Sequence, residues 1–426
     1  MSRKMRIFYL ALFLFLPVSA FAYLDPGTGS LLLYAVFGLF ATALSAIRNA
    51  WYGLRGKLVL FSDVSVSMRM PDVIFHSEGG KYWPVFKPVV QALEMEGIAC
   101  AYVTPDASDP GLAFKAGGFN AFRPGGEMAT IAWMNAARAA MVVSTTPHLD
   151  IYMLKRSRGV RKYVHLFHAP TDLCFYEKYA FDWYDCLFTV GTFQERSVRY
   201  LETRRGTARK ELLPTGCTYY DYMVEEFARQ ERQATSGTTV LYAPAWGVRS
   251  SALTRGAEII DVLARDGNQV IFRPHPQFYI SHKEIIGYLE KRFTGNPLVE
   301  IDRNRTGINS MLRSDLMITD LSGVLFDYAL LFGKPILLAN SEADTGGQEG
   351  EELPRPLWDI EASKALSFAL IDGELSSLPE QVEAALAFSD KNEERIREFR
   401  DRTFYNFGKS GAAAAQNLAS LLRGIS

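Results

Sequence analysis

The stretch DVIFHSEGGKYWPVFKPVVQALEMEGIACAYVT, residues 72–104, decides the fold class. Residues 72–76 form a short apolar run rich in β-branched side chains, which is typical of a buried strand, and the SEGG that follows indicates a turn. Residues 83–96 carry apolar side chains at helical spacing, and residues 98–104 form a second apolar run. This order of strand, helix and strand predicts a parallel βαβ unit.

The same alternation continues along the chain and predicts an α/β fold with two Rossmann-like doubly wound domains. The polar stretch 228–238 has no apolar periodicity, so we expect the domain boundary there. The N-terminal domain would span 58–230, and the C-terminal domain, with its C-terminal helices, would span 231–426. Further strands are predicted at 140–144, 162–168, 186–190, 239–243, 269–273, 298–301, 316–319 and 335–338.

The N-terminus has the pattern of a membrane-targeting region. Residues 1–22 combine three early basic residues, an apolar run and an A-x-A sequence, which predicts a signal peptide or a first membrane segment. Within 23–57, the uncharged stretch 30–47 would make about 27 Å of helix, enough to cross a bilayer. Basic residues follow this stretch, so the positive-inside rule predicts a single-span anchor in the cytoplasmic membrane, with the remaining chain on the cytoplasmic side. The alternative is that 30–47 is a buried core helix of a secreted protein.

Composition limits the other classes of function. The 46 Lys and Arg residues nearly balance the 47 Asp and Glu residues, so no global charge favours a nucleic-acid partner. The four cysteines are widely spaced without a C-x-x-C pair, which argues against a zinc site and a disulfide scaffold. We expect no metal site and no cofactor. No Walker A motif and no strand-linked G-x-G-x-x-G occurs, so P-loop and NAD-binding classes are disfavoured.

Three segments collect polar residues at predicted strand ends, where an open α/β sheet binds its ligand. In HLFHAPTD, residues 165–172, alternation along a strand would turn His165 and His168 to opposite faces. His168 is nearer the carboxyl end, and a neutral imidazole there could act as a general base. For both histidines the simpler interpretation, a core or surface residue with a satisfied hydrogen bond, stays open.

The other two segments suit phosphate groups. The strand at 269–273 runs into RPHP, where prolines stiffen the exit and hold the cationic side chain of Arg273 and the imidazole of His275. The segment SDLMITDLSGVLFD, residues 314–327, predicts a strand, a tight turn and a helix whose N-terminus could bind an anion. Ser322 could cap that helix, donate to a phosphate, or do both.

Together these segments resemble the CDP-glycerol glycerophosphotransferase family, which builds poly(glycerol phosphate) in teichoic acids. The resemblance covers about residues 140 to 415. Its motifs in order are His168 with YDCLFTVG (184–191), LYAPAW (241–246), FRPHP (272–276), SDLMITDLS (314–322) with the following Phe326 and Asp327, and GKPI (333–336).

The resemblance implies a GT-B-like fold and a phosphotransfer reaction. An acceptor hydroxyl would attack the glycerol-bearing phosphorus of CDP-glycerol, or of another CDP-alcohol, and CMP would leave. His168 would be the general base, and Arg273 and His275 would steady the pyrophosphate. The helix predicted within residues 314–327 would hold the nucleotide at its start, through Ser322 and Gly323, together with Asp320 and Asp327. The predicted anchor suggests a lipid-linked or glycan acceptor.

Two other interpretations stay open from the sequence. A GT-B nucleotide-sugar glycosyltransferase or a UDP-sugar 2-epimerase could use the same strand-end histidines and helix start. A non-catalytic membrane scaffold could keep the fold without turnover.

Overall fold

The computed structural model describes residues 71–230, 237–304, 307–371 and 375–425, which lie within one compact unit, Val66–Ser426. The predicted signal peptide, the span at 30–47 and its flanks therefore lie outside the described residues. Among the residues that are described, no helix is long and apolar enough to cross a membrane.

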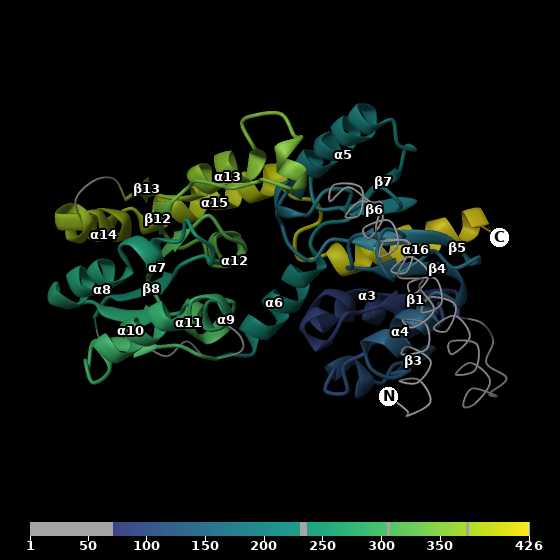
Figure 1. The fold of residues 1–426 in the computed structure, drawn as a ribbon, viewed down its shortest axis with the longest axis horizontal. Coiled ribbons are helices and arrows are strands. Elements are labelled where there is room, and N and C mark those ends of the chain that lie inside the picture. Colours follow the sequence, from purple (N-terminus) through teal and green to yellow (C-terminus); the bar gives the residue numbers. More distant parts are fainter. Residues whose placement is uncertain (1–70, 231–236, 305–306, 372–374, 426) are drawn as a thin grey trace, which may run out of the picture. The chain divides into compact units, whose positions relative to one another are not determined.

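Two fully parallel sheets form the framework (Figure 1). The first has the order β3-β2-β1-β4-β5-β6-β7, and the second has the order β10-β9-β8-β11-β12-β13. Each order begins with the Rossmann arrangement, so the two doubly wound sheets expected from the sequence are confirmed. The first sheet consists of β1 (Val73–His76), β2 (Cys100–Val103), β3 (Phe119–Phe122), β4 (Arg138–Ser144), β5 (Gly159–Leu166), β6 (Cys186–Thr189) and β7 (Glu211–Pro214). The second consists of β8 (Thr239–Ala243), β9 (Gln269–Phe272), β10 (Val299–Ile301), β11 (Leu316–Asp320), β12 (Ile336–Asn340) and β13 (Ala369–Leu370).

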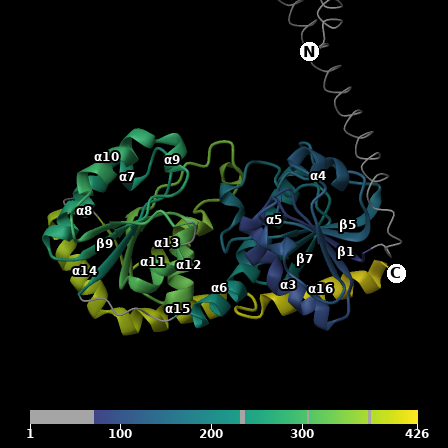
Figure 2. The ribbon, with the colours of Figure 1, turned by 90° about the horizontal axis from the view of Figure 1, so that it is seen from below.

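Helices connect the strands and cover the sheets (Figures 1 and 2). Among the described residues, the α-helices that precede β8 are α3 (Trp83–Met95), α4 (Glu127–Met134), α5 (Thr192–Arg205) and α6 (Thr218–Ala228). Those that follow β8 are α7 (Ser251–Thr254), α8 (Gly256–Arg265), α9 (Phe278–Ser281), α10 (Lys283–Phe293), α11 (Ile308–Arg313), α12 (Gly323–Phe332), α13 (Trp358–Leu366), α14 (Leu378–Ala387), α15 (Ser389–Thr403) and α16 (Ser410–Ile425).

The core consists of three buried apolar clusters. Two of them pack on the strands of a single sheet, and the third contains residues from both sheets and the helices between them. Within this shared cluster the rings of Phe193, on α5, and Trp358, on α13, stack with centroids 3.6 Å apart. The two sheets therefore share part of one hydrophobic core.

The last helix, α16, corrects the expected domain organisation. We expected all of 231–426 to go with the second sheet, but Ala414, Ala415, Leu418 and Leu421 belong to the buried cluster around β1 and α3. Figures 1 and 2 show α16 beside the first sheet and α3. The reason is local: α3 presents an apolar face that the helical periodicity of α16 can cover.

Gly411 lets α16 approach α3 closely. A Cβ atom on Gly411 would lie 2.7 Å from Cβ and 2.8 Å from the carbonyl carbon of Pro88. Gly424, on the same helix, has nothing within 4 Å of such an atom. The two glycines therefore form a matched pair for testing this contact.

We predict that Gly411→Ala lowers the free energy of unfolding by about 1–3 kcal/mol, because it overpacks the contact between α16 and α3. Gly424→Ala should raise it by up to about 1 kcal/mol, because alanine favours an open helical position. Urea unfolding of both variants measures the difference. Equal effects of the two substitutions would contradict the close packing of α16.

Candidate functional site

The strand orders indicate where a ligand should bind. In each sheet the order reverses once, between β1 and β4 in the first and between β8 and β11 in the second. Doubly wound sheets bind ligands at the carboxyl ends of the strands beside this reversal. The candidate site is therefore described from these two edges.

Polar side chains occupy the reversal point of the first sheet. His76 ends β1 and Ser144 ends β4 in register with it, and His165 of β5 is in register with Ser144. The Nδ1 atom of His76 lies 3.1 Å from Oγ of Ser144. Burial lowers the pKa of His76 to about 4, so its imidazole is neutral near pH 7.

His168 lies in the loop beyond β5, at this same edge. The strand ends at Leu166, so the prediction that His168 ends the strand is wrong by two residues. The imidazole packs edge-on against the rings of Tyr82 and Tyr176, with centroids 5.3 and 6.2 Å away. Within the described part of the chain its Nδ1 atom is buried without a hydrogen-bond partner. Burial, and then the charge of Lys81, lowers the pKa of His168 to about 4.

His165 has a different environment. It is fully buried, and its ring contacts the aromatic rings of Phe167, Phe181 and Tyr184. Burial, followed by the charge of His168, holds its pKa well below the usual value. His165 belongs to β5, whereas His168 lies beyond its end, so strand alternation does not decide where His168 points and the expected difference between the two histidines stays a prediction.

Asp320 organises the reversal point of the second sheet. It is the last residue of β11, and its Oδ2 atom accepts hydrogen bonds from the backbone N–H groups of Ala245 (2.9 Å) and Ser251 (3.1 Å). The hydroxyl of Ser250 also faces this oxygen at 3.4 Å. Burial raises the pKa of Asp320 to about 6, although these donors oppose the shift. Asp320 therefore fixes the loop that follows β8.

Ser322 and Gly323 stand at the start of α12. Ser322 has extended backbone at the N-cap position, but its side chain makes no capping hydrogen bond. Its Oγ atom lies 3.3 Å from Oγ1 of Thr319. Gly323 has no heavy atom within 4 Å of where its Cβ would be, so the first turn of α12 is open to a ligand.

Arg273 and His275 follow β9, which neighbours β8. The Arg273 guanidinium donates to Asp302 at 2.6 Å and to the carbonyl oxygen of Asn304 at 3.0 Å. His275 is exposed, and its Nδ1 atom accepts a hydrogen bond from the backbone of Gln277 at 3.1 Å. Partial burial and the charge of Arg273 lower the pKa of His275. The sequence did not predict that Arg273 is held by an acidic partner.

Asp327 lies in a different place from the other predicted nucleotide-binding residues. Its carboxyl group faces Tyr220 and Cys217 at the start of α6, and burial raises its pKa to about 7. Asp320, Ser322 and Gly323 follow one strand and lie together, whereas Asp327 is turned towards α6. The expectation that Asp327 shapes the nucleotide pocket stays a prediction without a supporting contact.

Sequence reasoning missed a buried acidic pair that includes Asp172, which follows His168 in the same loop. Asp172 and Asp359 are 3% and 0% exposed, and the backbone N–H of Asp172 donates to Asp359 at 3.0 Å. The Cys174 thiol donates to the other oxygen of Asp359 at 2.8 Å. Burial and then the neighbouring charge of Asp359 raise the pKa of Asp172. Only the position of Asp172 beside His168 gave a signal in the sequence, because Asp359 is 187 residues away.

All four cysteines are buried and unpaired. In the described ranges no group of three or more histidine, cysteine, aspartate or glutamate side chains is arranged to hold a metal ion.

Comparisons with known structures show the fold. A histidine-to-asparagine variant of the wall teichoic acid polymerase TagF, soaked with CDPG, is 13% identical, covers 91% of this chain and 98% of its own, and has a TM-score of 0.58. The UDP-GlcNAc 2-epimerase of Methanocaldococcus jannaschii is 15% identical, covers 83% and 100%, and has a TM-score of 0.54. The S. aureus MnaA structure with UDP is 13% identical, covers 82% and 95%, and has a TM-score of 0.52. No curated protein sequence matched this chain.

A family model shows the relationship in sequence. The model described as CDP-glycerol:poly(glycerophosphate) glycerophosphotransferase matches residues 177–411, more than half of the chain. The match includes Arg273, His275, Ser322 and the other predicted nucleotide-binding residues, and it begins nine residues after His168. The chain therefore belongs to the CDP-glycerol:poly(glycerophosphate) glycerophosphotransferase family.

Proposed function

We propose that this protein transfers glycerol phosphate, or a related polyol phosphate, from a CDP-alcohol to an acceptor hydroxyl. The observation that carries the proposal is the family match over residues 177–411, combined with polar strand ends at both sheet reversals. The acceptor oxygen would form a bond to the glycerol-bearing phosphorus. The bond from that phosphorus to the CMP oxygen would break, and CMP would leave.

His168 is the proposed general base. It has a neutral imidazole with an unpartnered ring nitrogen in the described part of the chain, and it lies beside the exposed cation Lys81. The proton of the attacking hydroxyl would move to this imidazole. The charge of the diphosphate should favour the imidazolium, because negative charge nearby opposes the effects of burial and Lys81.

The second sheet would hold the donor. The open first turn of α12 offers free N–H groups and the positive end of the helix dipole, and Ser322 adds a hydroxyl that is not used for capping. Arg273 and His275 would add positive charge and a hydrogen-bond donor. Because Asp302 holds the Arg273 guanidinium at 2.6 Å and offsets its charge, we propose that Arg273 acts mainly as a hydrogen-bond donor held in a fixed direction.

A UDP-sugar 2-epimerase or glycosyltransferase is the second candidate. It is favoured by the similarity in fold to a UDP-GlcNAc 2-epimerase, at a TM-score of 0.54, and to the MnaA structure with UDP, at a TM-score of 0.52. Assays of CMP release from CDP-glycerol beside UDP-sugar turnover separate the two candidates. CMP release with no change to the UDP-sugars supports the proposed transferase, and turnover of neither donor would favour the scaffold interpretation.

We predict that His168→Ala lowers CMP release by about 10²–10⁴-fold while CDP affinity is kept, because a general base contributes this much. In the wild type, kcat/KM should be level above pH 5 and fall as the pH drops through the pKa of about 4, where the imidazole gains its proton. A pH series of initial rates measures both effects. Normal turnover by His168→Ala would require a different base, and His165→Ala serves as the structural control.

We predict that Ser322→Ala weakens CDP binding by roughly three- to tenfold, as expected for one lost hydrogen bond, and leaves the melting temperature unchanged. The control is Ser250→Ala, because the Ser250 hydroxyl accepts from the backbone of Ala252 and caps α7. That variant should lower the melting temperature instead. Calorimetric titration with CDP and thermal unfolding distinguish the two, and unchanged CDP affinity in Ser322→Ala would place the diphosphate elsewhere.

We also propose that residues 23–57 anchor the protein in the cytoplasmic membrane, with the transferase on the cytoplasmic side and a lipid-linked or glycan acceptor. The proposal is supported by the uncharged stretch 30–47 and the basic residues after it. A cysteine introduced at the exposed position Lys291 should resist an impermeant thiol reagent in intact cells and react after lysis. Labelling from outside would refute this orientation.

A further inference from the structure

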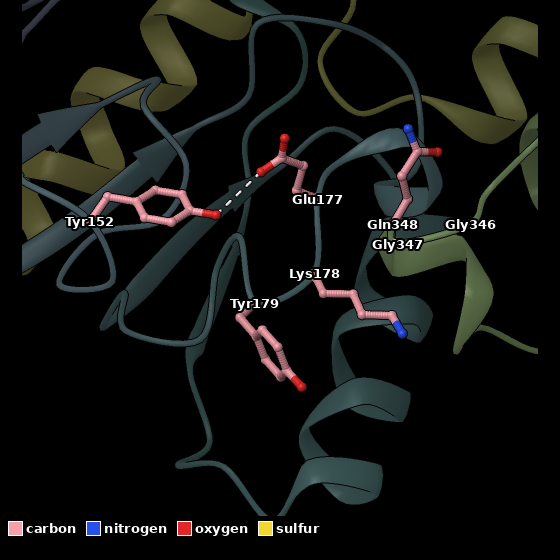
Figure 3. A pocket seen from close by; sticks show the side chains of 7 residues that line it. All are labelled: Tyr152, Glu177, Lys178, Tyr179, Gly346, Gly347 and Gln348. Carbon is pink, nitrogen blue, oxygen red and sulfur yellow. Dashed lines mark hydrogen bonds between the residues drawn. The ribbon is translucent and has the colours of Figure 1, made fainter. Parts of the chain in front are cut away.

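A polar cavity of about 460 Å³ lies beside the loop that carries His168 (Figure 3). Its volume falls in the range of small-molecule sites. Three separate segments line it: the connection between β4 and β5, the β5–β6 loop (residues 167–185), and the segment 341–357 after β12, which we call the strap. The lining residues are Tyr152, Glu177, Lys178, Tyr179, Gly346, Gly347 and Gln348.

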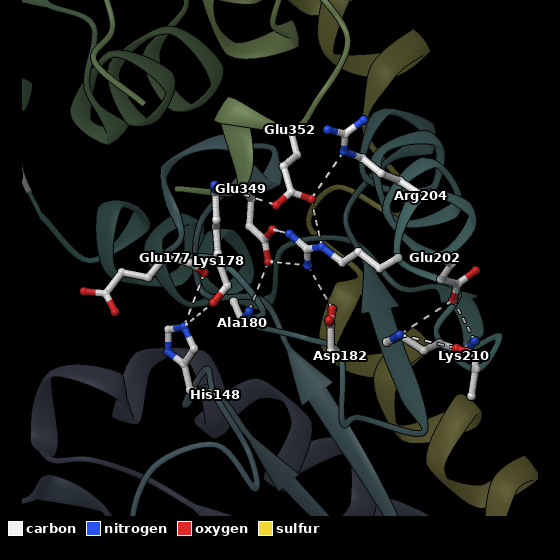
Figure 4. Close-up of polar contacts among 12 residues, drawn as sticks. His148, Glu177, Lys178, Ala180, Asp182, Glu202, Arg204, Lys210, Glu349 and Glu352 are labelled. Carbon is white, nitrogen blue, oxygen red and sulfur yellow. Dashed lines mark hydrogen bonds and ion pairs between the residues drawn. The ribbon is translucent and has the colours of Figure 1, made fainter. Parts of the chain in front are cut away.

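Backbone contacts hold the walls of this cavity in place. Glu177 and Gln348 form an antiparallel bridge between the β5–β6 loop and the strap, and the N–H of Lys178 donates to the carbonyl of Gly347 at 3.3 Å. His148 Nε2 donates to the carbonyl oxygens of Glu177 (3.3 Å) and Lys178 (3.2 Å) from the other side (Figure 4). The cavity is therefore built from fixed segments.

Tyr179 is held in an unfavourable backbone conformation at the edge of this cavity. Its φ of 68° lies in the left-handed region, which a bulky side chain rarely adopts. The guanidinium of Arg205 lies 4.7 Å from the centre of the Tyr179 ring, and buried ion pairs fix Arg205 to Glu349 and Asp182. Strain of this kind persists where the surroundings determine the position of a functional side chain.

The lining chemistry selects against phosphate. The side chains of Tyr152 and Tyr179 are 60% and 49% exposed, so their rings and hydroxyls are accessible. The Lys178 ammonium is already paired with Glu351, 3.0 Å away. The Glu177 carboxylate accepts from the Tyr152 hydroxyl at 3.4 Å and has no cationic partner among the described residues. An anionic ligand would therefore meet an uncompensated negative charge.

The same lining suits a neutral ligand with several hydroxyl groups. Gln348 adds a side-chain amide to the lining, and its N–H groups can donate to a ligand hydroxyl. Glu177 offers acceptor positions, and the tyrosine rings offer flat apolar faces to C–H groups. The geometry points to a binding site for a neutral polyhydroxylated ligand, either a sugar or a polyol.

The location relates this site to the acceptor. Tyr176 packs against His168 and directly precedes Glu177, so the same loop forms a wall of the cavity and contacts the proposed base. That the bound sugar or polyol is part of the acceptor rests on the proposed function. The binding site itself rests on the cavity alone.

The test titrates the full-length protein in detergent with three probes, observed by saturation-transfer NMR. The probes are the disaccharide of N-acetylglucosamine, ribitol, and glycerol 3-phosphate as the anionic probe. We expect a neutral probe to bind and glycerol 3-phosphate to bind more weakly; preference for the disaccharide identifies a sugar site, and preference for ribitol a polyol site. Tyr152→Ala and Tyr179→Ala should each weaken binding by roughly three- to tenfold.

Tyr200→Ala is the matched control, because Tyr200 is an exposed tyrosine (39%) outside the cavity and should change nothing. Thermal unfolding checks that each variant is folded, and Tyr152→Phe provides a second, milder change that removes only the hydroxyl. Absence of neutral binding, tighter binding of glycerol 3-phosphate, or unchanged affinity in both alanine variants would overturn the site.

CMP release from CDP-glycerol is measured in parallel. Release without sugar or polyol binding refutes this site alone, and binding without release refutes the proposed function alone.

Discussion

The buried ion pair between Arg205 and Glu349 fastens the strap to α5, the helix that follows β6 of the first sheet. Their side chains are 7% and 1% exposed, and Arg205 also contacts Asp182 and Glu352, each at 3.0 Å. Removing one partner of such a pair leaves an unpaired buried charge, which costs about 3–5 kcal/mol. Glu349 is also bound through its backbone, because its N–H donates to the carbonyl of Tyr176 at 2.7 Å. One residue of the second half of the chain thus fixes the loop that carries His168.

Because of this attachment, the β5–β6 loop connects the proposed base, the buried carboxyl pair and the polar cavity. The β5–β6 loop carries His168 near its start, continues through Asp172 and Cys174, which contact Asp359, and then forms a wall of the polar cavity. A shift of β12 or α13 in the second sheet would displace the strap or Asp359. Their contacts would then transmit this shift to the β5–β6 loop. Burial of the two carboxyl groups, Asp172 and Asp359, costs folding free energy. The hydrogen bonds from Cys174 and Ser197 offset only part of this cost. Such a cost is tolerated where a position matters for function.

The sequence predicted the central strands of both sheets and the edge strand β10, and it missed the other three edge strands. Buried central strands such as β1, β4, β8 and β11 are continuous apolar runs, because both of their faces are covered. The missed strands β3, β7 and β13 are sheet edges, and the residues of β3 and β7 are partly or fully exposed, so they lack that signal. The site followed the same rule: strand-end residues such as Asp320 were identified locally, whereas Arg205 and Glu349 are 144 residues apart and each resembles an ordinary surface charge.

The environment of His168 connects the proposed chemistry to ligand binding. Without a ligand, burial and Lys81 disfavour the imidazolium and keep the ring neutral, which is the form a base needs, but such a ring accepts a proton weakly. Under the proposed function, the anionic diphosphate would arrive before the proton moves. Its charge would stabilise the imidazolium and strengthen the base only when the donor is bound. The low pKa makes His168 a poor base when no donor is bound. Proton transfer would then occur only in the complex with the donor, where the phosphorus is ready for attack by the acceptor oxygen.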